Sequence, residues 1–153
     1  MKPLIFALIC LAIVFLLLFF FRYEKGYEGV NENQDKLQII KIGNAQIRVS
    51  LADTEMLREK GLQNVEKMDG EQGMLFLFAN PRPATFWNKN TLIDLDLIWI
   101  RDKHVSGISF LPNESGGGKV YVSSPGAIEY VVEANAGFAS SRGIKIGDKV
   151  EGI

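Results

Sequence analysis

The segment from residue 86 to residue 96 holds the side chains best suited to binding or catalysis in this chain of 153 residues. Aromatic rings stand there beside amide, hydroxyl, ammonium and carboxylate groups. This combination is typical of pockets for small ligands, since rings supply contact area and a few polar atoms fix the orientation of the ligand. The candidate ligand-binding residues are therefore Phe86, Trp87, Lys89, Asn90, Thr91 and Asp96.

Asp96 is the most informative of these residues, because it interrupts an apolar strand predicted over residues 95–100. Side chains alternate across a strand, so Asp96 shares its face with the isoleucines two and four positions later. A carboxylate on an apolar face is costly unless it is paired or hydrogen-bonded. In a structural interpretation, which the sequence favours, Asp96 accepts hydrogen bonds from the preceding turn and from Lys89. In a functional interpretation, it belongs to a polar site bordered by Phe86 and Trp87.

Other motifs give weaker evidence for chemistry. Asp94 and Asp96 could together bind a hard cation or exchange protons, but Asp94 is more typical of a solvated turn. The glycine-rich residues 116–119 lack the spaced glycines and the hydroxyl of a phosphate-binding loop. His104, the single histidine of the chain, has no partner residues that would form a catalytic system. The sequence therefore leaves the catalytic residues unknown, and we predict no metal site and no cofactor; an enzyme is the less favoured interpretation.

Short strands and helices must position this segment. Two β-type runs around Gly43–Asn44 predict a hairpin, and Asp53 or Thr54 together with Gly61 predict the two ends of a short helix. Asn135 is the expected cap of a second short helix. The pattern predicts a mainly β (α+β) fold: a small, largely closed β-barrel with one or two short helices, preceded by one transmembrane helix. The further predicted strands cover residues 73–78, 95–100, 104–110, 120–122, 127–134 and 144–150.

An ordered set of motifs in the chain resembles the family called domain of unknown function 192. The motifs are GMLFLF (73–78), FWNKNTLIDLDLIWI (86–100), VEANAG (132–137) and GIKIGDKV (143–150), with shorter matches at 52–54 and 58–62. The resemblance implies a compact β-rich barrel with short helices, and it implies no activity, because the function of the family is not established. The chain departs from the family pattern at Asn88, where Met is usual, and at Asp94, where Pro is common.

The N-terminal region carries an unbroken apolar run over residues 4–21, bounded by Lys2 and Arg22. A transmembrane helix needs roughly 20 apolar residues, so this run predicts a single membrane anchor. A cleaved signal peptide is the alternative, but residues 19–24 offer no small residues at which cleavage would occur. A lipoprotein signal would use Cys10, the single cysteine, yet a bulky residue precedes it.

These features divide the chain into an N-terminal transmembrane anchor (1–22), a linker (23–35) and a soluble β-barrel domain (36–153). The short N-terminal tail with Lys2 favours a cytoplasmic N-terminus, which would place the domain in the periplasm or outside the cell. The formal net charge of −1 and the absence of a basic block argue against a nucleic-acid partner.

Three functions fit the sequence. The leading hypothesis is a membrane-tethered, extracytoplasmic binding or accessory domain, with the membrane as one partner through residues 4–21 and a small polar ligand, a glycan or a protein as another. The second is a hydrolase-type enzyme that uses Asp96 as base and Lys89 to stabilise charge. The third is a purely structural or assembly protein. Asp96 and Lys89 open to solvent in a pocket would favour the first two, and a tightly packed Asp96 would favour the third.

Overall fold

A β-hairpin opens the described part of the chain, which is residues 37–153 of a computed structural model. Its strands β1 (Gln38–Ile42) and β2 (Ala45–Ala52) run antiparallel. The connection is the pair Gly43–Asn44, and Gly43 has a φ of 56°, which glycine adopts without strain. The hairpin predicted from this pair is therefore confirmed.

Helix α2 (Glu55–Lys60) follows the hairpin and carries the chain back, so that β3 (Gln72–Arg82) lies parallel to β2. The helix begins after Thr54, whose Oγ1 accepts a hydrogen bond from the Leu57 N–H at 3.2 Å, and it ends at Gly61. Both ends agree with the prediction, because a hydroxyl satisfies an N–H at the start of a helix and glycine tolerates the turn at its end.

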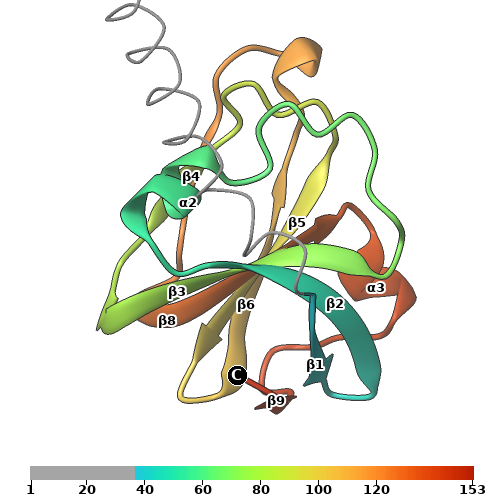
Figure 1. Ribbon diagram of the computed structural model, residues 1–153. Coiled ribbons are helices and arrows are strands. Elements are labelled where there is room, and N and C mark those ends of the chain that lie inside the picture. The colour runs from blue at the N-terminus through green and yellow to red at the C-terminus, as the bar shows by residue number, and fades with distance from the viewer. Residues whose placement is uncertain (1–36) are drawn as a thin grey trace, which may run out of the picture. The chain divides into compact units, whose positions relative to one another are not determined.

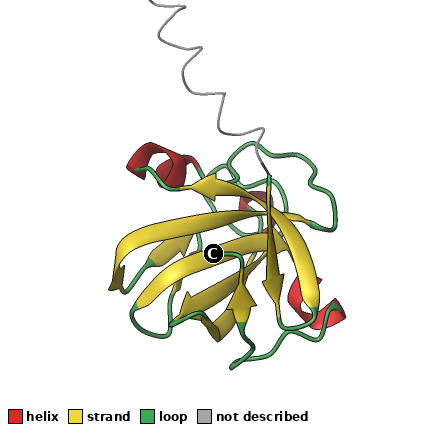
Figure 2. Ribbon diagram, turned by 60° about the horizontal axis from the view of Figure 1, so that its bottom comes forward, coloured by secondary structure: helices red, strands yellow, loops and turns green. Residues whose placement is uncertain are grey.

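One curled sheet dominates the fold of residues 37–153 (Figures 1 and 2). Four strands join β1, β2 and β3 in it: β5 (Leu95–Arg101), β6 (His104–Leu111), β8 (Ile128–Asn135) and β9 (Val150–Glu151). Their order is β6-β5-β8-β3-β2-β1-β9. The two edge strands meet at one end, where the Val150 N–H donates to the Lys103 carbonyl at 2.8 Å and the Val105 N–H donates to the Asp148 carbonyl at 2.9 Å. The fold is mainly β with short helices, as predicted, but the sheet forms a curled half-barrel instead of the largely closed barrel that was predicted.

A second sheet, two-stranded in the described part of the chain, consists of β4 (Thr85–Trp87) and β7 (Tyr121–Ser123). The chain reaches it because β3 extends beyond the predicted 73–78 as far as Arg82. The pairing of β3 with β8 is irregular between Leu77 and Arg82, and this interval contains a proline, which cannot donate to a ladder. The extension brings Arg82 close to the start of β4.

The second short helix, α3 (Phe138–Ser141), does not have the predicted cap. The residue before it is Gly137, with a φ of 84°, and the Asn135 side chain turns elsewhere. The Asn135 amide donates to the backbone carbonyls of Met68 and Asp69, both at 3.0 Å. The prediction was wrong because glycine occupies the cap position and Asn135 still belongs to β8.

The seven-stranded sheet separates two apolar clusters among the described residues. We call the side within the curl, where α3 packs, the α3 face, and the side covered by α2 and β4 the α2 face. Successive residues of β5 belong to the two clusters in turn, because neighbouring residues of a strand point to opposite sides of the sheet. The α3 face includes Ile40, Ile42, Ile47, Leu75, Ile98, Ile100, Val132 and Phe138, and the α2 face includes Phe76, Leu97, Trp99, Leu111, Ile128 and Val131.

The predicted anchor (1–22) and linker (23–35) lie outside the described residues, and both stay predictions. The helices found in residues 37–153 are all too short or too polar to cross a membrane.

Candidate functional site

The structure separates Asp96 from the aromatic residues predicted to lie beside it. Asp96 is 8% exposed and points to the α3 face, where its Oδ2 accepts a hydrogen bond from the Ala139 N–H at 2.9 Å. Ala139 lies in the first turn of α3, so Asp96 takes the role of a helix cap from a distant strand. The structural interpretation predicted partners in the preceding turn and in Lys89, and the partner is the helix instead.

Lys89 lies over an aromatic ring. Its Nζ is 4.9 Å from the centroid of the Trp87 ring, which suits a cation–π contact. The Trp87 ring also lies near the Tyr121 ring, at a centroid distance of 6.2 Å. Asp96, by contrast, is bound to α3 on the other face of the sheet. The proposed hydrolase pair of Asp96 and Lys89 is therefore not brought together.

Asn90 joins loops. Its backbone has a φ of 52°, its N–H donates to the Glu114 Oε2 at 2.7 Å, and its side-chain amide donates to the Gln63 Oε1 at 3.3 Å. Asparagine is one of the residues that adopt this left-handed conformation most readily. Thr91 is buried, and its hydroxyl donates to the Lys89 carbonyl at 3.5 Å.

The two positions where the chain departs from the family pattern have local partners. The buried Asn88 amide donates to the Gly118 carbonyl at 3.0 Å and accepts from the Val120 N–H at 2.8 Å, so its polarity is satisfied by the facing loop. The exposed Asp94 accepts two hydrogen bonds of 2.7 Å from the backbone and the side chain of Asn113. In residues 37–153 there is no group of three or more His, Cys, Asp or Glu side chains that could hold a metal ion.

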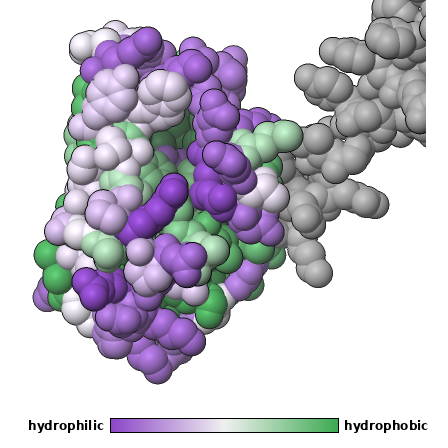
Figure 3. Space-filling view, turned by 90° about the vertical axis from the view of Figure 1, so that its left-hand side faces the viewer, coloured by the Kyte–Doolittle hydropathy of each residue, from purple (hydrophilic) through white to green (hydrophobic). Residues whose placement is uncertain are grey.

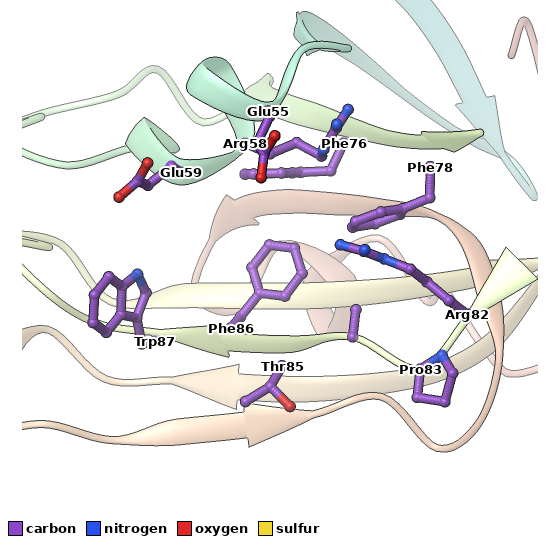
Figure 4. A pocket seen from close by; sticks show the side chains of 11 residues that line it. Glu55, Arg58, Glu59, Phe76, Phe78, Arg82, Pro83, Thr85, Phe86 and Trp87 are labelled. Carbon is purple, nitrogen blue, oxygen red and sulfur yellow. The ribbon is translucent and has the colours of Figure 1, made fainter. Parts of the chain in front are cut away.

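A cleft with a volume of about 820 Å³ opens on the α2 face, between α2 and β4 (Figure 4). In the space-filling view of this side, hydrophobic surface lies in a hollow with hydrophilic side chains around it (Figure 3). Eleven residues line the cleft: Glu55, Arg58 and Glu59 of α2, Phe76, Phe78 and Arg82 of β3, Pro83 and Ala84, and Thr85, Phe86 and Trp87 of β4.

Aromatic rings form the inner wall of the cleft. The Phe86 ring makes edge-to-face contacts with Phe76 and Trp99, at centroid distances of 4.8 Å and 5.5 Å. Trp87 is half-buried beside it. Two of the six predicted ligand-binding residues thus line this cleft.

Two arginines flank the Phe78 ring, and they differ in what holds them. The Arg58 guanidinium donates to the carbonyls of Asp53 and Leu77 at 2.7 Å and 2.9 Å, so it fastens α2 to β3. The Arg82 guanidinium lies 4.9 Å from the Phe78 centroid, is exposed, and forms no ion pair within residues 37–153. Arg82 is therefore the cation that can meet a ligand.

A smaller cavity of about 30 Å³ lies behind the cleft, and we call it the inner cavity. Phe86, Trp87 and Thr91 line it, and so does Glu133 of β8, which the sequence analysis did not identify. The available signal was the second of two carboxylates in strand 127–134, which directly follows the apolar pair at 131 and 132. The inner cavity is also lined by the end of α2 and the turn after it, including Lys60, Gly61, Leu62 and Gln63.

Glu133 is the buried ionisable group of this face. It is 4% exposed, and its Oε2 has no hydrogen-bond partner in the described residues. Burial raises the pKa of Glu133 from 4.5 to about 8, because the charged form loses its hydration, and a hydrogen bond from the Leu62 backbone lowers the pKa by less. Glu133 therefore carries a proton at neutral pH in the empty protein.

The domain resembles a family and two solved structures. Residues 38–152 match DUF192, a family described as an uncharacterized ACR. The domain is similar to the crystal structure of a protein from Sinorhizobium meliloti 1021 that is described as a proposed transcription regulator. The sequences are 30% identical and the TM-score is 0.69, over 76% of this chain and 94% of that one. A protein of unknown function from Novosphingobium aromaticivorans DSM 12444 is 34% identical, with a TM-score of 0.69, over 75% of this chain and 84% of that one. No curated protein matches the chain.

Proposed function

The chain belongs to the DUF192 family, and we propose that its domain is a binding or accessory module that holds a small polar ligand in the cleft between α2 and β4. The cleft carries the proposal. It is concave, it has aromatic inner walls, and it presents the Arg82 guanidinium opposite carboxylates of α2. Ligand sites are built in this way, from apolar walls and a few polar groups. Its volume of about 820 Å³ suits a small molecule.

The rival functions explain less. A hydrolase that uses Asp96 and Lys89 needs both groups at one site, and these lie on opposite faces of the sheet. A purely structural role accounts for Asp96, which caps α3, but it leaves the cleft on the other face without a purpose.

The location of the domain is part of the proposal. Residues 4–21 would anchor the chain in a membrane, with the N-terminus in the cytoplasm and the cleft in the periplasm or outside the cell. After carbonate extraction we expect the full-length chain to stay with the membrane fraction. Mature protein that lacks the residues before Tyr23 would show a cleaved signal instead.

A nucleic-acid partner is not proposed. The Sinorhizobium meliloti protein is described as a proposed transcription regulator, but binding to the phosphate backbone requires a basic surface. This chain has 17 basic and 18 acidic side chains, so charge gives no support for that role.

Ligand screening with the full-length chain in detergent tests the proposal. Compounds that enter the cleft should change the fluorescence of Trp87, and the Trp87→Phe variant measures the part of the signal that comes from the buried Trp99. Arg82→Ala should weaken binding, and Arg101→Ala, which removes an exposed arginine outside the cleft, should not. If a screen of small polar compounds gives no binding, or if binding ignores Arg82 and Trp87, the proposal is wrong.

A further inference from the structure

We infer that Glu133 anchors a primary ammonium group, so that the ligand of the cleft is a small organic amine whose head group enters the inner cavity. This inference rests on the proposed function, because it assigns the chemical class of the ligand to the same cleft. The observations that carry it are a buried carboxyl oxygen without a partner in the described residues, a cavity lined by the same residue, and aromatic walls around the cavity.

The carboxyl group of Glu133 is buried, has an unpaired oxygen and belongs to a residue that lines a cavity, as expected of a group that binds a ligand. Buried polar atoms are almost always hydrogen-bonded, and each exception calls for an explanation. The Glu133 Oε2 is such an exception among the described residues, and Glu133 lines the inner cavity. A hydrogen-bond donor brought in by a ligand would satisfy this atom.

The inner cavity adjoins the cleft. Five residues line both spaces: Arg58, Glu59, Phe76, Phe86 and Trp87. Three of them are aromatic, and aromatic faces attract cations. A ligand whose body lies in the cleft can therefore extend one group past Phe86 and Trp87 toward Glu133.

The size of the inner cavity selects the head group. A space of about 10–15 Å³ for a water-sized sphere holds one water molecule. The inner cavity, at about 30 Å³, therefore admits an ammonium group. A quaternary ammonium or a guanidinium is too large for it.

Other charged groups around the inner cavity leave Glu133 without a cation. Arg58, Glu59 and Lys60 of α2 line the same space. Arg58 is engaged with backbone carbonyls, while Glu59 and Lys60 are exposed, and none of the three forms an ion pair with Glu133 in residues 37–153. A bound ammonium would be the missing counter-charge, and it would favour the ionised carboxylate.

Proton release follows from this arrangement. Because the pKa of Glu133 is about 8 in the empty protein, the carboxyl group must lose its proton when it pairs with an ammonium at lower pH. One proton should leave for each amine bound, and the affinity should rise about tenfold per pH unit below pH 8.

The experiment compares 2-phenylethylamine with 2-phenylethanol, which is similar in size and uncharged. Calorimetric titration of the full-length chain in detergent, at about pH 6.5 and in two buffers of different ionisation enthalpy, measures affinity and proton release together. Trp87 fluorescence reports whether either compound occupies the cleft. We expect the amine to bind with release of one proton and the alcohol to bind at least about 30-fold more weakly.

Two matched variants assign the effect. Glu133→Gln keeps the size of the side chain and should weaken amine binding by about 30-fold or more, with proton release lost. Glu66→Gln removes an exposed carboxylate that lines neither the cleft nor the inner cavity, and it should change affinity by less than about threefold.

The other outcomes overturn the inference. Equal binding of amine and alcohol, with alcohol affinity falling as pH rises, would show that Glu133 acts as a neutral hydrogen-bond donor. Amine binding that survives Glu133→Gln would place the ammonium elsewhere. Both results would leave the cleft as a ligand site, whereas no binding of either compound, together with a negative wider screen, would remove the proposed function itself.

Discussion

In the described part of the chain, each face of the main sheet buries a carboxyl group, and the two groups have opposite surroundings. Asp96 on the α3 face accepts a hydrogen bond from the Ala139 N–H in the first turn of α3. Glu133 on the α2 face lies beside Gly61 and Leu62, which follow the last turn of α2. The start of a helix offers N–H donors and the end offers carbonyls. The start of α3 thus supplies an N–H to Asp96, whereas Glu133 receives a hydrogen bond from the Leu62 backbone and still keeps its Oε2 unpaired within the described residues.

The difference separates a structural acid from a candidate functional one. Both residues interrupt apolar strands, so burial alone does not distinguish them. The two residues are distinguished by the helix end that each carboxyl group faces. The α3 face is closed around its acid, and the α2 face leaves a cavity and a cleft beside its acid.

The largest expected effect is the pH dependence of stability caused by Glu133. Its folded-state pKa of about 8 lies above the unfolded value of 4.5, so the folded protein binds the proton more tightly. The contribution to stability is complete below the unfolded pKa and is lost as pH rises toward the folded pKa. The loss amounts to roughly 5 kcal/mol in all, at most about 1.4 kcal/mol per pH unit.

Urea melts of wild type and Glu133→Gln across that pH range test this expectation. The variant should gain stability relative to wild type as pH rises, because glutamine does not titrate, and other groups cancel in the difference. A constant difference across the range would mean that Glu133 titrates normally, and the contrast between the two faces would fail.

Asp96→Ala should have the next largest effect. It leaves the Ala139 N–H without its acceptor, which costs about 1–3 kcal/mol for a buried group. Asp96→Asn retains an acceptor and should cost less. Denaturant melts at neutral pH measure both. Equal losses for the two variants would show that the charge, rather than the hydrogen bond, matters on the α3 face.

Thr54→Ala tests whether the position of α2 depends on its N-terminal cap, and whether ligand binding in the cleft depends on that position. The substitution removes the acceptor for the Leu57 N–H and should lower the free energy of unfolding by about 1 kcal/mol. Because α2 forms one wall of the cleft, ligand affinity should fall as well. Ser124→Ala removes the acceptor for the Ala84 N–H and serves as a comparison on the opposite wall. If both variants bind ligand like wild type, the position of α2 does not shape the site.

The smallest expected change in stability is that of Trp87→Ala. Trp87 is half-buried and its ring touches Tyr121 and Lys89, so its loss should cost less than about 1 kcal/mol, while binding in the cleft should disappear. Trp99→Ala provides the contrast, since truncating a fully buried aromatic side chain costs about 3–5 kcal/mol. Similar losses for the two variants would make Trp87 a core residue.

The sequence predicts what depends on neighbours along the chain. The Gly43–Asn44 turn, the two ends of α2 and the alternation that buries Asp96 all follow from local rules. The predicted cap of α3 was wrong. Asn135 lies only three residues before the helix and looked like its cap, but the side-chain acceptor is Asp96, which lies 43 residues before Ala139.

The inner cavity depends on topology, which local patterns do not contain. Glu133 meets the end of α2 because β8 lies between β3 and β5, and because β2 and β3 run parallel. The carboxylate of Glu133, which follows two valines in strand 127–134, was visible in the sequence. Its missing partner was not, since a partner could have come from any element of the fold.

The pairing of β9 with β1 sets the order of events during synthesis. The last strand of the chain pairs beside the first strand of the described domain, and the Gln38 side chain also bonds the Gly152 carbonyl. This edge of the sheet can therefore form only after β9 has left the ribosome. Such long-range closure is slow compared with local contacts. Until β9 pairs, Ile40 and Ile42 of the nascent domain lack part of their cover, which exposes the domain to chaperones and to aggregation.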